Sequence, residues 1–511
     1  MIPMYYKYNR KLIFVTLIQL CFNSTSSQNV YKDYIIEAFP MNLLEYEYRS
    51  INDSNFSSFN GIRPMLVKNN SKYFDISIIS HAAINDGHPN IDNSSEFYAL
   101  KGLNRMNTMR FVYGNKWLFF TLEPQIMHHQ NLESSYTKSP DSFSYLNSRN
   151  INDRGGITKS GFRRSGLLLQ YGGIGLGYTN MSNWWGPGLH SSISLTSNSS
   201  GFYSYIFGTF RDIQYKNIGF GFRMMVAEIG ERDKMPFYLS GLVGWLNFHT
   251  EPHITLGLSR QYLSGGINNL SQETSLNRGW TIKDAANLIF EPLFSQDKNN
   301  DYIIANTPGF DYWDQTLTGF IELTFKSPLL KLYFEISSDD NRGNFTDLKA
   351  HWDHSLGYLL GFRKYYKINN NKFVIGSEYL STKNSNSFKF RRVSIAQLNY
   401  YSKDIYNFST YEGRRLGAHS GSDSDDFIIF AGIKFPKQSI TLFFNIERHG
   451  IKSQIVPEFK KEIMFVFSYD LNNYHSIFIN FEYETIDNYN FSTNYFSTSK
   501  LFWLGYSISF H

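Results

Sequence analysis

Two histidines in the sequence stand directly before a serine, at His190–Ser191 and at His419–Ser420. A histidine that meets a serine hydroxyl can serve as the base of a nucleophilic hydrolase. Adjacent residues of an extended strand point to opposite faces, however, so neither pair makes that contact within a strand. The pattern therefore disfavours catalysis, and we expect the protein not to be an enzyme.

Three aspartates follow the second histidine, at Asp423, Asp425 and Asp426, with Gly421 before them. Carboxylates spaced in this way resemble part of a calcium-binding loop, but the twelve-residue spacing and the closing glutamate of such a loop are missing. The single cysteine, Cys21, lies in an apolar run near the N-terminus and offers no pair for a disulfide. We therefore predict a solvated loop around Asp423, no metal site and no cofactor.

Apolar and polar residues alternate through much of the chain, as they do in strands with one apolar and one polar face. The segment "SITLFFNIER" separates an apolar set from a mixed set, namely Ile440, Leu442, Phe444 and Ile446 from Thr441, Phe443, Asn445 and Glu447. Carboxylates and lysines in the middle of a strand are costly inside a soluble sandwich, but they are normal where that face lines a watery lumen. The alternation therefore predicts strands that face lipid on one side and a lumen on the other.

Tight turns and long polar loops alternate along the chain, which favours a barrel over a sandwich. Tight turns are expected at 113–116, 171–174, 369–371, 435–438 and 471–473, and long loops at 126–160, 264–315, 340–355, 403–425 and 485–499. Short turns on one rim and long loops on the other are typical of outer-membrane barrels. The alternating segments make roughly eighteen to twenty strands of the length that spans a bilayer. The predicted fold class is all-β: a transmembrane antiparallel β-barrel of about 18 strands over residues 71–511.

The N-terminus has the composition of an export signal. Basic residues precede an apolar run, Leu12 to Phe22, and small polar residues follow it. We predict a signal peptide over residues 1–27; the alternative is an N-terminal anchor helix, for which the run is short. Residues 28–70 are expected to form an N-terminal periplasmic segment, and the sequence leaves open whether it contains a short helix. The net charge of +5 is weak for 511 residues, and nucleic acid is not an expected partner.

The stretch "NWWGPGLHSSISLTSNSSGF" and the patch "YEGRRLGAHSGSDSDDF" (411–427) resemble the signature of the capsule assembly Wzi-type outer-membrane proteins. A weaker patch, "YFEISSDDNRGNF", adds to the resemblance, which spans at least residues 155–430. It implies a lectin-like barrel in the bacterial outer membrane that attaches capsular or exopolysaccharide to the cell surface and catalyses nothing. The family has an N-terminal helical bundle, and residues 28–70 lack the periodicity of one. Outer-membrane lipid and the barrel assembly machinery are the other expected partners.

Under this resemblance the candidate polysaccharide-binding residues are Arg414, Arg415, Trp184, Trp185, His190, Asp423 and Asp425. Arginines pair well with acidic sugars, although a salt-bridge network in the lumen explains Arg414 and Arg415 equally. Indole rings pack on sugar C–H groups. Because Trp184 and Trp185 run into the rigid Gly-Pro-Gly corner at 186–188, however, they are first of all a structural joint.

Two function classes remain: a surface polysaccharide-binding protein and a porin-like diffusion channel. The lumen discriminates between them, because eighteen strands leave an aqueous pore unless loops or side chains fill it. Aromatic residues on the polar faces, such as Tyr333, Phe443 and Phe478, favour filling.

Residues 264–315 are rich in Asn, Gln, Asp and Lys and cannot face lipid, so we predict an extracellular loop. An epitope inserted at Asn299 should bind antibody on intact cells. Labelling that requires permeabilised cells would contradict this topology.

Overall fold

The computed structural model describes residues 35–51, 56, 58–66, 72–90, 92–132, 155–232, 235–265, 313–339, 356–383 and 409–510. The predicted signal peptide, 1–27, and almost all of the predicted loop 264–315 lie outside the described residues. Both remain predictions.

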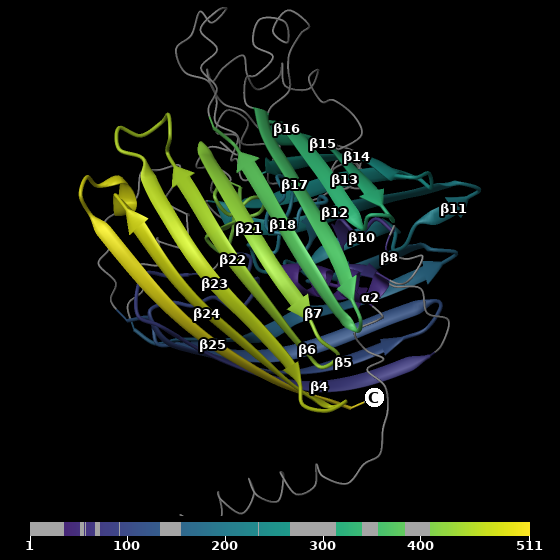
Figure 1. Ribbon diagram of the computed structural model, residues 1–511, viewed down its shortest axis with the longest axis horizontal. Helices are drawn as coiled ribbons and strands as arrows, with labels where there is room; N and C mark the ends of the chain where they lie inside the picture. Colours follow the sequence, from purple (N-terminus) through teal and green to yellow (C-terminus); the bar gives the residue numbers. More distant parts are fainter. Residues whose placement is uncertain are drawn as a thin grey trace, which may run out of the picture.

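The described strands close into one 18-strand antiparallel β-barrel, as the sequence predicts (Figure 1). The barrel strands are β4 (Tyr73–Asn85), β5 (Gly102–Gly114), β6 (Leu118–His129), β7 (Ile157–Tyr171), β8 (Ile174–Thr179), β10 (Ser204–Thr209), β11 (Ile213–Tyr215), β12 (Ile218–Arg232), β13 (Met235–Phe248), β14 (His253–Gly265), β15 (Trp313–Phe325), β16 (Leu330–Asp339), β17 (Leu356–Ile368), β18 (Asn371–Ser381), β21 (Ser424–Lys434), β22 (Gln438–His449), β23 (Glu458–Asp470), β24 (His475–Asp487) and β25 (Phe496–Phe510). Both β10 and β11 pair with β12, and they fill one position in the ring. The last strand, β25, pairs with the first, β4, and closes it.

The side chains of the barrel strands alternate between the outside and the lumen. In β22, Leu442 and Phe444 are 50% and 37% exposed, whereas Phe443 and Asn445 are buried in the lumen. The same alternation in β16 and β24 turns carboxylates such as Glu335 and Glu482 inward. Because the outer positions carry large apolar side chains, we infer that the wall faces lipid.

The two rims of the barrel differ as expected. All five predicted tight turns connect neighbouring strands, at β5–β6, β7–β8, β17–β18, β21–β22 and β23–β24, and we call this end the turn rim. The opposite end, the loop rim, carries the long connections. The chain also ends at the turn rim, where β25 finishes (Figure 1).

The described part of the N-terminal segment lies inside the barrel and contains a helix. Helix α2 (Pro40–Ser50) begins at Pro40, whose fixed φ suits a first helical turn. Its residues Leu43, Leu44 and Tyr48 pack against lumen-facing Val374 and Phe430. Figure 1 shows the helix within the ring of strands. The described residues between 35 and 66 therefore lie in the lumen, where their apolar and charged side chains have partners on the inner wall.

Three connections from the loop rim also fold into the lumen: 86–101, 180–203 and 409–423, here called the lumenal loops. Short strands join these parts, namely β1 (Ile35–Ile36) with β3 (Met65–Leu66), β2 (Ile62–Arg63) with β9 (Trp184–Trp185), and β19 (Thr410–Tyr411) with β20 (Arg414–Arg415). Backbone hydrogen bonds link the loops directly, from Ser95 to Ser197 and from Thr196 to Leu416. The N-terminal segment and the three loops form one packed plug.

A short 3-10 helix, η8 (Tyr489–Phe491), lies in the β24–β25 connection. Among the residues that the structure describes, no helix has the length and apolar content needed to cross a membrane.

The exposed position of Leu442 gives a test of the outer surface. Leu442→Arg places a guanidinium about halfway along β22 and should cost about 2–4 kcal/mol of folding free energy in a bilayer. Gln438→Arg, on the same face but at the turn rim, should cost about 0–1 kcal/mol. Urea unfolding in lipid vesicles measures both changes, and equal losses would contradict a lipid-facing wall.

Candidate functional site

The plug is attached to the wall by buried ion pairs, of which the Glu47 network is the most complete. Glu47 on α2 accepts two hydrogen bonds from Arg363, at 3.0 and 3.1 Å, and lies 3.2 Å from the Lys331 ammonium. Tyr365 donates a further hydrogen bond to the same carboxylate. All of these side chains are buried. A buried carboxylate needs such partners, because removal from water is costly for an unpaired charge.

The charges around Glu47 change its acidity. Burial by itself raises the pKa of the Glu47 carboxyl group. The nearby Arg363 and Lys331 cations lower it by more, so that the pKa falls from an ordinary 4.5 to about 2. Glu47 is therefore ionised at neutral pH, and α2 carries a charge that its partners on the wall compensate.

A second network joins the chain before α2 to strands β5 and β7. Glu37 lies 3.0 Å from Arg110 and 2.6 Å from Arg164. Glu96 of the first lumenal loop lies 3.5 Å from Arg164 and 3.8 Å from Arg163. The N-terminal segment and the loop therefore share Arg164.

Two wall carboxylates bind the corner at 186–193. Glu378 accepts hydrogen bonds from the backbone N–H groups of Leu189, at 2.5 Å, and His190, at 2.9 Å. Glu335 accepts one from Ile193, at 2.9 Å. Gly186 has φ +153°, and a Cβ there would collide with the Glu335 carboxylate. The Gly-Pro-Gly sequence thus lets the backbone approach the wall closely enough to be bound.

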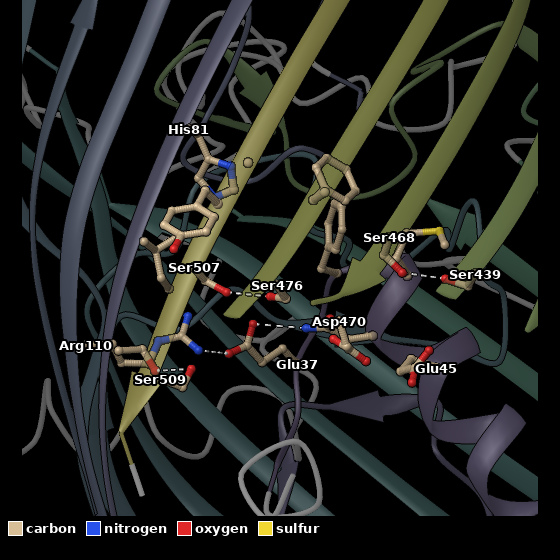
Figure 2. Close-up of a pocket in the computed structure, with 18 of the residues that line it drawn as sticks. Glu37, Glu45, His81, Arg110, Ser439, Ser468, Asp470, Ser476, Ser507 and Ser509 are labelled. Carbon is tan, nitrogen blue, oxygen red and sulfur yellow. Dashed lines mark hydrogen bonds and ion pairs between the residues drawn. The ribbon is translucent and has the colours of Figure 1, made fainter. Parts of the chain in front are cut away.

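A cavity of about 340 Å³ lies between α2 and strands β4, β5 and β22–β25. Its lining includes the turn 472–475, so it lies at the turn rim. Serines from neighbouring strands pair along its wall, Ser476 with Ser507 and Ser439 with Ser468 (Figure 2). Glu37 and Arg110 meet at the same cavity.

A smaller cavity of about 80 Å³ shares the side chains of Phe97, Phe478 and Trp503 with the larger one. It ends at carboxylates from the strands, including Glu462 and Glu482. The larger cavity, of about 340 Å³, has the volume of a small-ligand pocket. Its hydroxyl groups and aromatic rings suit a small polar ligand such as a sugar unit.

Trp184 and Trp185 lie in the plug and are fully buried. The Arg63 guanidinium lies 4.4 Å from the Trp184 ring, and Trp185 packs in a cluster with Leu195 and Ile206. These contacts explain two adjacent indoles at the corner as a joint between the N-terminal segment, the loop 180–203 and the wall.

Arg414 and Arg415 are also buried, with 1% and 2% exposure. Arg414 donates a hydrogen bond to the Ser95 carbonyl, and its guanidinium lies 4.7 Å from the Tyr98 ring. The Arg415 carbonyl accepts a hydrogen bond from the Asn198 side chain, at 3.2 Å. In this structure both arginines connect lumenal loops to one another and are out of reach of a polymer outside the barrel.

The two predicted aspartates have different surroundings. The predicted solvated loop around Asp423 is wrong, because this carboxylate is buried. It accepts hydrogen bonds from the backbone N–H groups of Lys452, at 2.8 Å, and Ser453, at 2.6 Å. Asp425 pairs with Arg448 and lies 3.3 Å from Lys383. These two cations are 49% and 30% exposed at the loop rim. Asp425 thus positions two positive charges toward the outside.

His190 and His419, distant in sequence, lie together in the lumen with their ring centres 4.6 Å apart. Both imidazoles lie beside Asp426. Within the described residues, no hydrogen bond joins His190 to Ser191 or His419 to Ser420. The two histidine–serine pairs therefore do not form a nucleophile and base.

Sequence reasoning missed the residues that attach the plug, above all Glu47, Arg363 and Glu378. The inward-facing charges of the strands were a signal that the lumen contains polar partners. Nothing in the local pattern around Glu47 indicates which strands it meets, because its partners follow hundreds of residues later.

Comparison with known proteins gives a fold but no family. No protein-family model and no curated protein matches the sequence. Among solved structures, the chain is similar to Wzi, an outer membrane protein involved in group 1 capsule assembly in Escherichia coli and described as a carbohydrate binding beta-barrel. The TM-score is 0.56 at 12% identity, over 98% of this chain and 92% of that one.

Weaker similarities are to OccAB4 of Acinetobacter baumannii, with a TM-score of 0.40 at 10% identity, and to OccK7 (OpdD) of Pseudomonas aeruginosa, with 0.41 at 9%. Each covers 86% of this chain, and 98% and 99% of the other chain respectively. The strand pairing and the similarity to Wzi give the fold, which is that of the 18-strand outer-membrane barrels.

The Glu47 network predicts how the plug is released. Among the described residues, Glu47→Gln leaves Arg363 and Lys331 with Glu322 as their one remaining carboxylate, which should cost about 3–5 kcal/mol of plug stability. Trypsin cleavage after Arg49 in detergent-purified protein should accelerate. Glu45→Gln is the control, because the ion pairs of Glu45 with Arg49 and Lys434 are partly exposed and should contribute less. Equal cleavage rates would contradict the role of Glu47.

In the wild type, stabilisation by Glu47 is complete above pH 4.5 and is lost as the pH falls toward about 2, because the folded state lowers the pKa of Glu47.

Proposed function

We propose that the protein is a polysaccharide-binding protein of the bacterial outer membrane, which attaches capsular or exopolysaccharide to the cell surface and catalyses no reaction. The observation that carries this proposal is the plug. Residues 35–66 and the three lumenal loops occupy the interior of a barrel that would otherwise contain a wide aqueous pore.

The plug favours the first of the two function classes considered from the sequence, the polysaccharide-binding protein. A diffusion channel requires a continuous water-filled path, whereas the described loops cross the lumen and are attached to the wall by Glu47, Glu335 and Glu378. A rigid interior of this kind suits a protein that binds a ligand at its surface.

The nature of the ligand is supported by the fold. Wzi, which shares the barrel over nearly the whole chain, is described as carbohydrate binding. The resemblance of the segment 411–427 to that family points to the same ligand class. We therefore take a capsular or exopolysaccharide as the partner.

The loop rim supplies charges for an acidic polymer. Arg448 and Lys383 are partly exposed there and are positioned by Asp425. A guanidinium binds a carboxylate through two parallel hydrogen bonds, which suits uronate sugars. Buried candidates such as Arg414 and Trp185 contribute by fixing the lumenal loops below this surface.

Two strains test the function and the site separately. A deletion strain should shed polysaccharide that the wild type retains, as measured by cell-bound against released polymer. Arg448→Ala with Lys383→Ala should release polymer from a barrel that still folds, because each charged hydrogen bond contributes about 1.5–3 kcal/mol to binding.

The control variant is Lys437→Ala, which removes an exposed charge at the turn rim. Unchanged retention in the deletion strain would overturn the proposed function. Unchanged retention in the double variant alone would remove Arg448 and Lys383 from the site. Solute uptake by liposomes that contain the purified protein would favour the channel instead.

A further inference from the structure

Three side chains from separate parts of the chain meet behind the corner at 186–193. His190 belongs to one lumenal loop, His419 to another, and Asp426 to strand β21 of the wall. The Nε2 atoms of His190 and His419 lie 3.3 and 3.4 Å from Oδ2 of Asp426. The three ligand atoms all lie within 4.8 Å of one another.

Asp426 lacks the hydrogen bonds that a buried carboxylate normally has. It is 2% exposed, and no hydrogen-bond donor meets Oδ1 or Oδ2 with acceptable geometry. Nε2 of His419 is likewise buried without a hydrogen bond. Such groups are rare and costly inside proteins. Nε2 of His190 lies 3.3 Å from the Asn445 side-chain amide as well as beside Asp426.

We propose that His190, His419 and Asp426 bind a transition-metal ion of the zinc class. Zinc binds imidazole nitrogen and carboxylate oxygen at about 2.0–2.1 Å in a tetrahedron, which places neighbouring ligand atoms about 3.3–3.4 Å apart. The observed separations from Asp426 have this length. Two imidazoles and one carboxylate are a ligand set that suits zinc better than calcium or magnesium.

The surrounding residues fit such a site. The Asn93 NH2 group donates to the His190 carbonyl, at 2.8 Å, and lies 3.4 Å from Nδ1 of His419, so it links the two loops beside the site. Glu447 lies 3.4 Å from Nε2 of His419, but its carboxylate is already bound by Lys460, at 2.9 Å, and His449, at 3.0 Å. The protein thus supplies three ligands, and the fourth position is open to water.

The neighbouring acidic cluster does not compete for the ion. Asp92, Glu462 and Glu484 lie within ligand distance of one another, but the Lys460 ammonium stands among them, 3.2 Å from Glu462 and 3.3 Å from Glu484. A lysine there supplies the positive charge that a metal would supply.

A metal at the three residues would connect the two loops to the wall. Metal binding would therefore stabilise the plug by mass action. This proposal is independent of the polysaccharide function.

Cobalt(II) is a suitable probe, because it occupies zinc sites and absorbs visible light strongly when four-coordinate. Detergent-purified protein, stripped with chelator and dialysed, should bind one Co²⁺ per chain with that absorption, and Zn²⁺ should displace it. Asp426→Asn, which keeps the shape of the side chain, should weaken binding at least tenfold. His128→Asn is the control, because it removes an exposed imidazole on the outside.

A second readout uses the wild type alone. Zn²⁺ should slow proteolysis of the lumenal loops, and chelator should restore the rate. Absence of four-coordinate Co²⁺ in the wild type would overturn the site and leave the two imidazoles as cations paired with Asp426. Binding that Asp426→Asn leaves unchanged, or that His128→Asn abolishes, would overturn it equally.

Discussion

The interior of this barrel depends on the compensation of buried charge. Glu47 on the plug helix is surrounded by Arg363 and Lys331 of the wall, and none of the three has access to water. Any one of them alone would be strongly unfavourable in that position, whereas together they form a stable arrangement. Glu322 of strand β15 also lies 3.2 Å from Lys331 and 3.7 Å from Arg363, so two carboxylates compensate the two cations. The N-terminal segment supplies one of these carboxylates, and the charge of Glu47 is compensated only while the segment lies inside.

The same principle explains which features could be predicted from the sequence. The alternation in β22 depends only on neighbours in one strand, and the tight turns at 113–116 and 369–371 depend on a few residues each. The sequence therefore predicts both. The barrel class followed from these local patterns. The course of residues 35–66 was not readable, because a short amphipathic helix has the same pattern against a wall, against lipid or against another domain.

The candidate site shows the same division. The turn residues at 186–188 and the adjacent indoles predict that this corner is a structural joint. A position in the lumen is one of the two alternatives that the sequence offers for Arg414, but its partner is not predictable, since the Ser95 carbonyl belongs to a loop more than three hundred residues earlier. The contact between His190 and His419 is not predictable either. The sequence places each histidine beside a serine, whereas in the structure the two histidines, from two loops, contact each other.

The closing pair of strands has a consequence for biogenesis. Because β25 pairs with β4, the ring can close only when these two strands meet. Residues 35–66 come first in the described chain, yet they pack against β17, β18 and β21, whose inner faces form a continuous surface only late. Insertion of the N-terminal segment and closure of the ring are thus coupled events. A segment that arrived after closure would have to enter through a narrow rim with its charges still hydrated, so the order of assembly favours capture of the helix while the seam is still open.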